Sequence, residues 1–174
     1  DAEVEHVDRH VGRLLAEIER TLPNALIIFS SDHASAFDAP AHDKKHYGYD
    51  LHSGVLHVPL IAAAPGIKPS RSTRLATLLD VVPTLADVLR YDGKGDFRGN
   101  SFADLFVAGA SSPPVHDIAF HQFYLPERRY QKKPALESMS VRDASLHLIF
   151  ERASSTYALY RWREDVDEKD DLYE

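Results

Sequence analysis

The sequence contains no cysteine and only one methionine and one tryptophan among 174 residues. The lack of cysteine excludes disulfides and thiolate metal sites within this stretch. No apolar run approaches the roughly 20 residues that a membrane-spanning helix needs, so no membrane span is expected here. The first residues, from Asp1, carry neither a signal peptide nor an initiator methionine, and they are typical of the inside of an amphipathic helix. We therefore expect a fragment with an upstream part.

Positive charge is also scarce. The 20 lysines and arginines are outnumbered by 27 aspartates and glutamates, which leaves a formal net charge of -7. The basic residues are dispersed apart from a short cluster at 128–133, whereas a nucleic-acid surface needs a concentrated basic patch. Nucleic acid is therefore not an expected partner. The 44% hydrophobic and 27% charged content is typical of a soluble globular protein.

A short apolar segment at residues 26–29 leads directly to Asp32 and His33. Its Ile and Phe content, after Pro23-Asn24, predicts a strand buried on both faces. In open α/β sheets the chemistry lies just beyond the carboxyl ends of such strands. A carboxylate and an imidazole held there form a credible half of a divalent-metal site. The simpler alternative is that Asp32 caps the next segment and His33 is an ordinary loop residue.

The surrounding pattern predicts an α/β fold. Apolar residues spaced by three and four positions predict a helix before the strand, and a second buried strand is expected at 58–64. Helix, tight turn and buried strand form the unit of a largely parallel sheet. Asp80 is expected to cap a further helix that contains Pro83 in its first turn and turns Leu85, Val88 and Leu89 inward.

The last third changes character. Short runs rich in aromatic and branched residues predict strands at 118–123, 138–142, 146–150 and 157–160 in a small antiparallel sheet. We expect residues 1–112 to form the carboxyl-terminal portion of the α/β domain, and residues 113–174 to form an antiparallel-sheet subdomain with an acidic tail. That tail, from Asp165 to Glu174, is expected to be solvated.

Several motifs occur in a recognisable order: residues 28–33 (IFSSDH), 57–61 (HVPLI), 65–66 (PG), 79–85 (LDVVPTL), 99–102 (GNSF) and 157–160 (YALY). Each motif alone is weak, but together they span nearly the whole chain. Their order resembles the carboxyl-terminal half of a sulfatase-type enzyme of the alkaline phosphatase superfamily. The resemblance implies an alkaline-phosphatase-like, largely parallel sheet with flanking helices, in addition to the small antiparallel sheet.

The resemblance also implies a metal-dependent sulfuric ester hydrolase. Asp32 and His33 match the pair that completes the metal shell, with Ca as the first expectation and Mn or Zn as alternatives. The nucleophile, a formylglycine, would belong to the missing amino-terminal half, so the fragment alone is expected to be inactive. The substrate would be a small anionic ester of the sulfated-sugar or aryl-sulfate type. The family also suggests a periplasmic or extracellular location.

In the family a basic residue contacts the ester oxygens. Counting back from the Val-Pro-Leu motif places that position at Tyr47 or Gly48, so His46 or Lys45 would have to be delivered by the loop. We expect His46 to bind the anion or protonate the leaving group, with Lys45 as the other candidate. Four further histidines are expected to have ordinary polar roles: His52, His57, His116 and His121.

Two alternatives remain open. The Asp-His pair, in place of Asp-Asn, favours a phosphoryl or phosphonate ester hydrolase or transferase on the same scaffold. Departures from the family pattern favour a catalytically inactive sulfatase-like binding domain: Ala34 replaces the usual Gly, Ser53-Gly54 replaces an acidic pair, and the basic residue is displaced. If Ala34 needed a positive φ, strain of about 1 kcal/mol would result.

Overall fold

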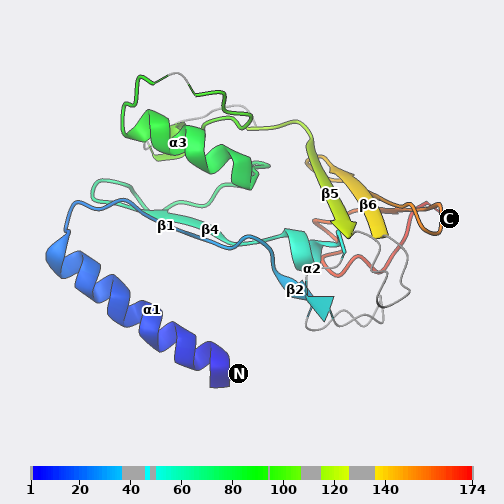
Figure 1. Ribbon diagram of the computed structural model, residues 1–174, viewed down its shortest axis with the longest axis horizontal. Helices are drawn as coiled ribbons and strands as arrows, with labels where there is room; N and C mark the ends of the chain where they lie inside the picture. The colour runs from blue at the N-terminus through cyan, green and yellow to red at the C-terminus, as the bar shows by residue number, and fades with distance from the viewer. Residues whose placement is uncertain are drawn as a thin grey trace.

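The computed structural model describes residues 2–36, 46–47, 50–93, 95–106, 115–125 and 136–173. Its elements, in chain order, are α1 (Ala2–Thr21), β1 (Ile27–Ser30), β2 (Ser35–Ala36), β3 (His46–Tyr47), α2 (Ser53–Leu56), β4 (Leu60–Ala63), the 3-10 helix η1 (Leu78–Asp80), α3 (Val81–Val88), the 3-10 helix η2 (Ala103–Phe106), β5 (Ala119–Leu125), β6 (Leu136–Arg142), β7 (His147–Glu151) and β8 (Thr156–Tyr160). In Figure 1 the β1–β4 pair lies between α1 and α3, and α2 and β2 lie between that pair and the β5–β8 sheet.

The predicted first helix is confirmed as α1. Acidic residues in its first turn and Arg20 in its last turn complement the helix dipole. No residue of α1 is buried, and Val4 and Leu14 are 72% and 59% exposed. The apolar stripe that the sequence predicts is therefore present but uncovered by the described part of the chain.

The fold class is confirmed as α/β with a small antiparallel sheet, but one detail of the sheet differs. Strands β1 and β4 pair antiparallel, with Ile27 opposite Ala63 and Ser30 opposite Leu60. Parallel neighbours need a crossover connection, whereas here the chain leaves β1, forms β2, β3 and α2, and returns in the opposite direction. Burial on both faces was also wrong for this pair, because no described element covers the partly exposed side chains of Phe29 and Ile61.

Helix α3 begins at Val81 with Pro83 in its first turn, as predicted. Asp80 is the N-cap residue of α3, as predicted, but its side chain makes no capping bond to this helix. Its carboxylate instead accepts the Thr77 amide at 2.6 Å within the capping box of η1. The predicted inward orientation was wrong for Val88 and Leu89, which are 38% and 71% exposed; Pro83 and Thr84 are the buried residues of α3.

The carboxyl-terminal sheet is the predicted antiparallel meander, with strand order β5-β6-β7-β8. Its ladders continue along the strands, for example from Ala119 opposite Arg142 in β5–β6. One face packs on the segment that leads into α2, where Leu51, Ile149 and Tyr160 form a buried apolar cluster. The sheet is therefore attached to the β1–β4 part through α2.

The acidic tail differs from the prediction of a solvated end. Glu168 is only 1% exposed, and the Leu172 amide donates to the Leu159 carbonyl of β8 at 2.8 Å. Trp162 is also buried, with the guanidinium groups of Arg142 and Arg163 lying 4.5 and 4.6 Å from its ring centroid. The tail folds back onto the sheet because Ser53 and His147 bind the Glu168 carboxylate there, and β8 binds the Leu172 amide.

Candidate metal site

Asp32 and His33 lie directly after β1, as the sequence predicts. Asp32 Oδ1 accepts the His33 backbone amide at 3.0 Å, so the two residues hold each other in one local turn. The Asp32 carboxylate is 87% exposed, and its Oδ2 lies 3.8 Å from His33 Nε2. The carboxylate oxygen and the ring nitrogen therefore face the same small region at the end of the strand.

The His33 ring is oriented by its neighbour. Its Nδ1 lies 2.9 Å from the Ala34 carbonyl oxygen, which can only accept, so Nδ1 is the donor; when the ring is neutral, its single proton is on Nδ1. Nε2 then carries the lone pair on the side of Asp32. This is the arrangement of a metal-binding histidine, in which the second nitrogen donates to a backbone carbonyl.

The two side chains fit a divalent cation. Ligand distances of about 2.0–2.6 Å allow two donor atoms on one ion to lie up to roughly 4–5 Å apart. The 3.8 Å between Asp32 Oδ2 and His33 Nε2 lies within that limit. Among the residues that the structure describes, no group of three or more His, Cys, Asp or Glu side chains could hold a metal. The described residues thus offer two ligands at this place.

The two predicted anion-binding residues are described to different extents. Lys45 lies outside the described residues. The backbone of His46 pairs with Ala36 in the β2–β3 ladder, and Ala36 lies only three residues beyond His33. The ladder therefore brings the His46 backbone to the same end of β1 as Asp32 and His33. Its role in the chemistry stays a prediction.

The departure at Ala34 carries no backbone strain. The positive-φ residues other than glycine in the described part of the chain are Arg90, Ser155 and Glu168, and Ala34 is not among them. Its amide donates to the Val55 carbonyl of α2 at 2.9 Å. The segment that carries Asp32 and His33 is therefore attached to α2 by a backbone hydrogen bond.

Helix α2 is in turn held by a buried polar group that sequence reasoning missed. The Ser53 amide and hydroxyl donate to Glu168 Oε2 and Oε1 at 2.8 and 2.7 Å. His147 Nδ1 donates to Glu168 Oε1 at 2.6 Å, and Arg142 donates to the Ser53 hydroxyl oxygen at 2.9 Å. We call Ser53, Arg142, His147 and Glu168 the tail cluster. No local signal marks it, because Ser53 and Glu168 are 115 residues apart.

In the tail cluster, hydrogen bonds and nearby charges oppose the effect of burial on the ionisable groups. Burial alone would raise the pKa of Glu168, but hydrogen bonds from His147 and Ser53 outweigh it and lower that pKa. Burial lowers the pKa of His147, an effect that Glu168 opposes only in part. His147 Nε2 has no hydrogen-bond partner among the described residues, which fits a neutral ring. The Glu168 carboxylate is therefore compensated by the Arg142 guanidinium.

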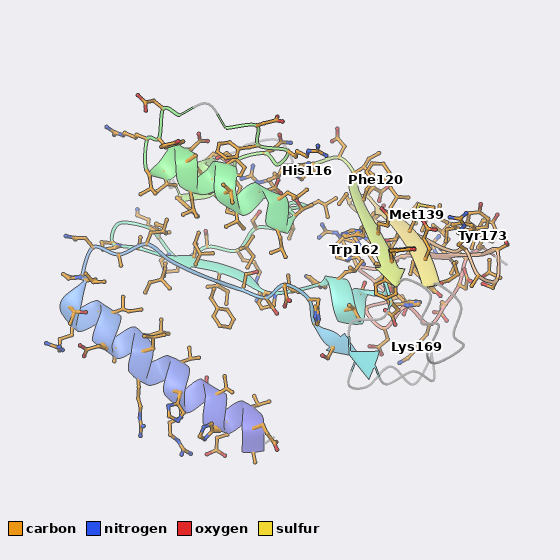
Figure 2. All side chains as sticks on the ribbon, viewed as in Figure 1. His116, Phe120, Met139, Trp162, Lys169 and Tyr173 are labelled. Atoms are coloured by element: carbon orange, nitrogen blue, oxygen red, sulfur yellow. The ribbon has the colours of Figure 1, made fainter. Side chains whose placement is uncertain are left out.

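Two of the other histidines, His116 and His121, make the polar contacts that the sequence predicts. His116 Nε2 donates to the buried Asp80 carboxylate at 2.7 Å, and Figure 2 shows His116 between α3 and β5. His121 Nδ1 lies 3.3 Å from the Ser140 hydroxyl. His52 and His57 lie with their rings 5.8 Å from Tyr160 and Trp162. In the described part of the chain, no helix has the length and apolarity needed to cross a bilayer.

Comparison with known proteins identifies related sequences. A family model described as Sulfatase matches residues 1–91. A choline-sulfatase of Rhizobium meliloti (strain 1021) is 36% identical over 89 residues, which cover 50% of this chain and 17% of the relative. An N-acetylglucosamine-6-sulfatase of Homo sapiens is 29% identical over 141 residues, which cover 77% of this chain and 24% of the relative. The chain thus spans about a fifth of the length of these curated relatives.

Solved structures agree on the fold. A protein solved in complex with its substrate D-glucosamine-2-N,6-O-disulfate matches with a TM-score of 0.69 at 22% identity, over 98% of this chain and 34% of its own. A phosphonate monoester hydrolase from Silicibacter pomeroyi matches with a TM-score of 0.72 at 23% identity, over 91% of this chain and 33% of its own. Since the matched family model covers residues 1–91 of 174, which include β1, Asp32 and His33, the chain belongs to the sulfatase family.

Proposed function

We propose that this chain supplies the carboxyl-terminal half of the active site of a metal-dependent sulfuric ester hydrolase. The observation that carries the proposal is the pair at the end of β1, where Asp32 Oδ2 and His33 Nε2 lie 3.8 Å apart. Membership of the sulfatase family supports the same reaction. The relatives are several times longer than this chain, so the remaining metal ligands and the nucleophile, a formylglycine, are assigned to the other part of the protein.

The residues of this chain have distinct tasks in that reaction. Asp32 and His33 hold a divalent cation, for which Ca is the first candidate and Mn or Zn are alternatives. When bound, the cation offsets the negative charge that develops on the ester oxygens. His46, whose backbone the β2–β3 ladder brings toward the pair, binds the anion or protonates the leaving oxygen, with Lys45 as the second candidate.

The substrate is assigned to the class of sulfated sugars or small aryl sulfates. The human relative is named for sulfated N-acetylglucosamine, and one structural neighbour was solved with a sulfated glucosamine. The net charge of -7 is unsuited to a polyanionic nucleic acid. A periplasmic or extracellular location, as well as a division into an α/β part (1–112) and a sheet subdomain (113–174), are further parts of this proposal.

The test measures metal content and turnover together. In the whole protein that contains this chain, we expect about one divalent ion per polypeptide and hydrolysis of an aryl sulfate. The Asp32→Ala, His33→Ala double variant should lose both. The matched control is His6→Ala, His10→Ala on the exposed face of α1, which should keep both. A double variant that retains full metal content would contradict the proposed site.

A second reaction is favoured by the Asp-His pair, namely hydrolysis of a phosphoryl or phosphonate ester on the same fold. The same purified protein would be given matched aryl sulfate, aryl phosphate and aryl phosphonate esters. A preference for the sulfate by at least about tenfold in kcat/KM, or about 1.4 kcal/mol in transition-state stabilisation, supports the sulfatase. The opposite preference supports the second reaction. Metal content without turnover of any ester would instead support an inactive binding domain.

A further inference from the structure

Hydrogen bonds and the short backbone segments between them connect the acidic tail to His33, a proposed metal ligand. It begins at Glu168, whose two carboxylate oxygens accept the amide and the hydroxyl of Ser53 at the start of α2. It continues through α2, because the Val55 carbonyl accepts the Ala34 amide at 2.9 Å. It ends at the Ala34 carbonyl, which accepts the Nδ1 proton of His33 at 2.9 Å.

We propose that Glu168 is a positioning residue for His33. By holding α2 against the sheet, it holds the backbone of Ala34, and the Ala34 carbonyl in turn keeps the His33 ring in the tautomer that presents Nε2 beside Asp32. The inference rests on the proposed function for its link to metal binding. The geometry of the hydrogen bonds is independent of that link.

Three properties of Glu168 separate it from an ordinary tail residue. It is 1% exposed, while its tail neighbours Asp167 and Lys169 are exposed. Its backbone has φ 51°, a conformation that non-glycine residues adopt at a cost and that persists only where the surroundings enforce it. Its carboxylate contacts Ser53 at the start of α2, so the tail reaches the helix that adjoins the metal pair.

Helix α2 depends on this carboxylate because it has no cap of its own. Its N-cap residue, His52, makes no side-chain capping bond, so the Ser53 amide is satisfied by Glu168. Arg142 donates to the Ser53 hydroxyl oxygen from the sheet side. Ser53 is thereby held from two directions, and both of its partners belong to the carboxyl-terminal sheet and tail.

The test substitutes Glu168→Gln in the whole protein with ¹⁵N-labelled histidine. An amide has one acceptor oxygen where the carboxylate has two, so either the Ser53 amide or the donors at Oε1 lose their acceptor. The ¹⁵N shifts of His33, assigned by comparison with His33→Gln, should change from a single Nδ1-protonated ring to a mixture of tautomers. Half-saturation by Mn²⁺, measured by electron paramagnetic resonance, should require about 3- to 10-fold more metal.

Two further variants distinguish positioning from general stability. Phe150→Leu weakens the ring packing with Tyr157 on the opposite face of the same sheet, away from the cluster that contacts α2, and it should leave the His33 shifts and the Mn²⁺ half-saturation unchanged although its Tm falls. Ser53→Ala removes the hydroxyl bond and keeps the amide bond. It should shift His33 in the same direction as Glu168→Gln but by less, and it serves if Glu168→Gln does not fold.

The outcomes separate this inference from the proposed function. Unchanged His33 shifts in both Glu168→Gln and Ser53→Ala would overturn the positioning role, as would equal shifts in Phe150→Leu. If His33→Gln keeps the wild-type Mn²⁺ affinity, the proposed metal site is wrong, and the shifts of His33 in the Glu168 variant still decide whether Glu168 orients that ring.

Discussion

At the scale of single residues, Asp80 shows how a buried carboxylate organises its surroundings. It is 0% exposed and accepts from the Thr77 amide and hydroxyl, the Asn100 amide and His116 Nε2. These donors come from segments up to 36 residues away. Asp80 therefore joins η1, the turn before η2 and the entrance to β5 through one side chain.

This role gives a prediction for Asp80→Ala. Removing the carboxylate leaves several donors buried without an acceptor, so we expect the free energy of unfolding to fall by about 3 kcal/mol. Urea unfolding followed by circular dichroism measures the change. The control Asp87→Ala, on the exposed side of α3, should stay within about 0.5 kcal/mol. Equal effects of the two substitutions would show that the Asp80 contacts contribute little.

At the scale of elements, the attachment of α2 to the β5–β8 sheet depends on apolar packing as well as on Glu168. Leu51, just before α2, is 3% exposed and packs with Ile149 of β7 and Tyr160 of β8. Leu51→Ala should lower the free energy of unfolding by about 3 kcal/mol, and Ile149→Val by about 1 kcal/mol. Because the side chains belong to one cluster, the double variant should depart from the sum by more than about 0.5 kcal/mol.

The control for this double-mutant comparison is a residue on the other face of the sheet. Met139 in β6 is 42% exposed and is labelled in Figure 2. Met139→Ala combined with Leu51→Ala should be additive within about 0.5 kcal/mol. Additivity in the Leu51 and Ile149 pair as well would mean that the two segments do not share a core.

Local patterns predicted the elements well, and long-range contacts explain where prediction failed. The strand at Ile27–Ser30 and the four-strand meander follow from apolar runs and turn residues, which are visible within a few positions. The antiparallel pairing of β1 with β4 depends on the path of the intervening chain, which composition does not reveal. The acidic composition of the tail indicated solvation, yet Glu168 is buried because Ser53, Arg142 and His147 supply its partners.

The candidate site likewise has a part that local sequence patterns predict and a part that only long-range contacts determine. Asp32 and His33 could be predicted because they directly follow a recognisable strand. Their support could not be predicted, because Val55 of α2 and Glu168 of the tail are brought to them only by the fold. The sequence predicted backbone strain at Ala34 if that residue needed a positive φ. In the structure Ala34 does not have a positive φ, so this strain is absent.

At the scale of the whole molecule, buried histidines make stability depend on pH. Burial, aided by the nearby Arg142 charge, lowers the pKa of His121 to about 4 and also lowers the pKa values of His57 and His147. In the unfolded chain these rings titrate near 6.5, so below that pH the unfolded state binds protons first. Stability is therefore fully present above about pH 6.5 and falls as the pH decreases toward about 4.

Urea midpoints between pH 7.5 and pH 4 would check this dependence. Glu168 adds to it below about pH 4.5, because its pKa is lowered in the folded protein and its contribution is lost as the carboxylate is protonated. His121→Phe should flatten the slope between pH 6.5 and 4, whereas His10→Gln on exposed α1 should leave it unchanged. An identical slope in wild type and His121→Phe would contradict the assignment.

The 115-residue separation between Ser53 and Glu168 has a consequence for the order of events during synthesis. A ribosome adds roughly 5–20 residues per second, so α2 leaves the tunnel about 6 to 23 s before its carboxylate partner. During that interval the Ser53 amide has no Glu168 to bond, and the ring of His33 lacks its distant support. A polypeptide that stops short of residue 168 stays in that state permanently. Glu168 therefore completes the support of the proposed metal-ligand pair more than a hundred residues after that pair has been translated.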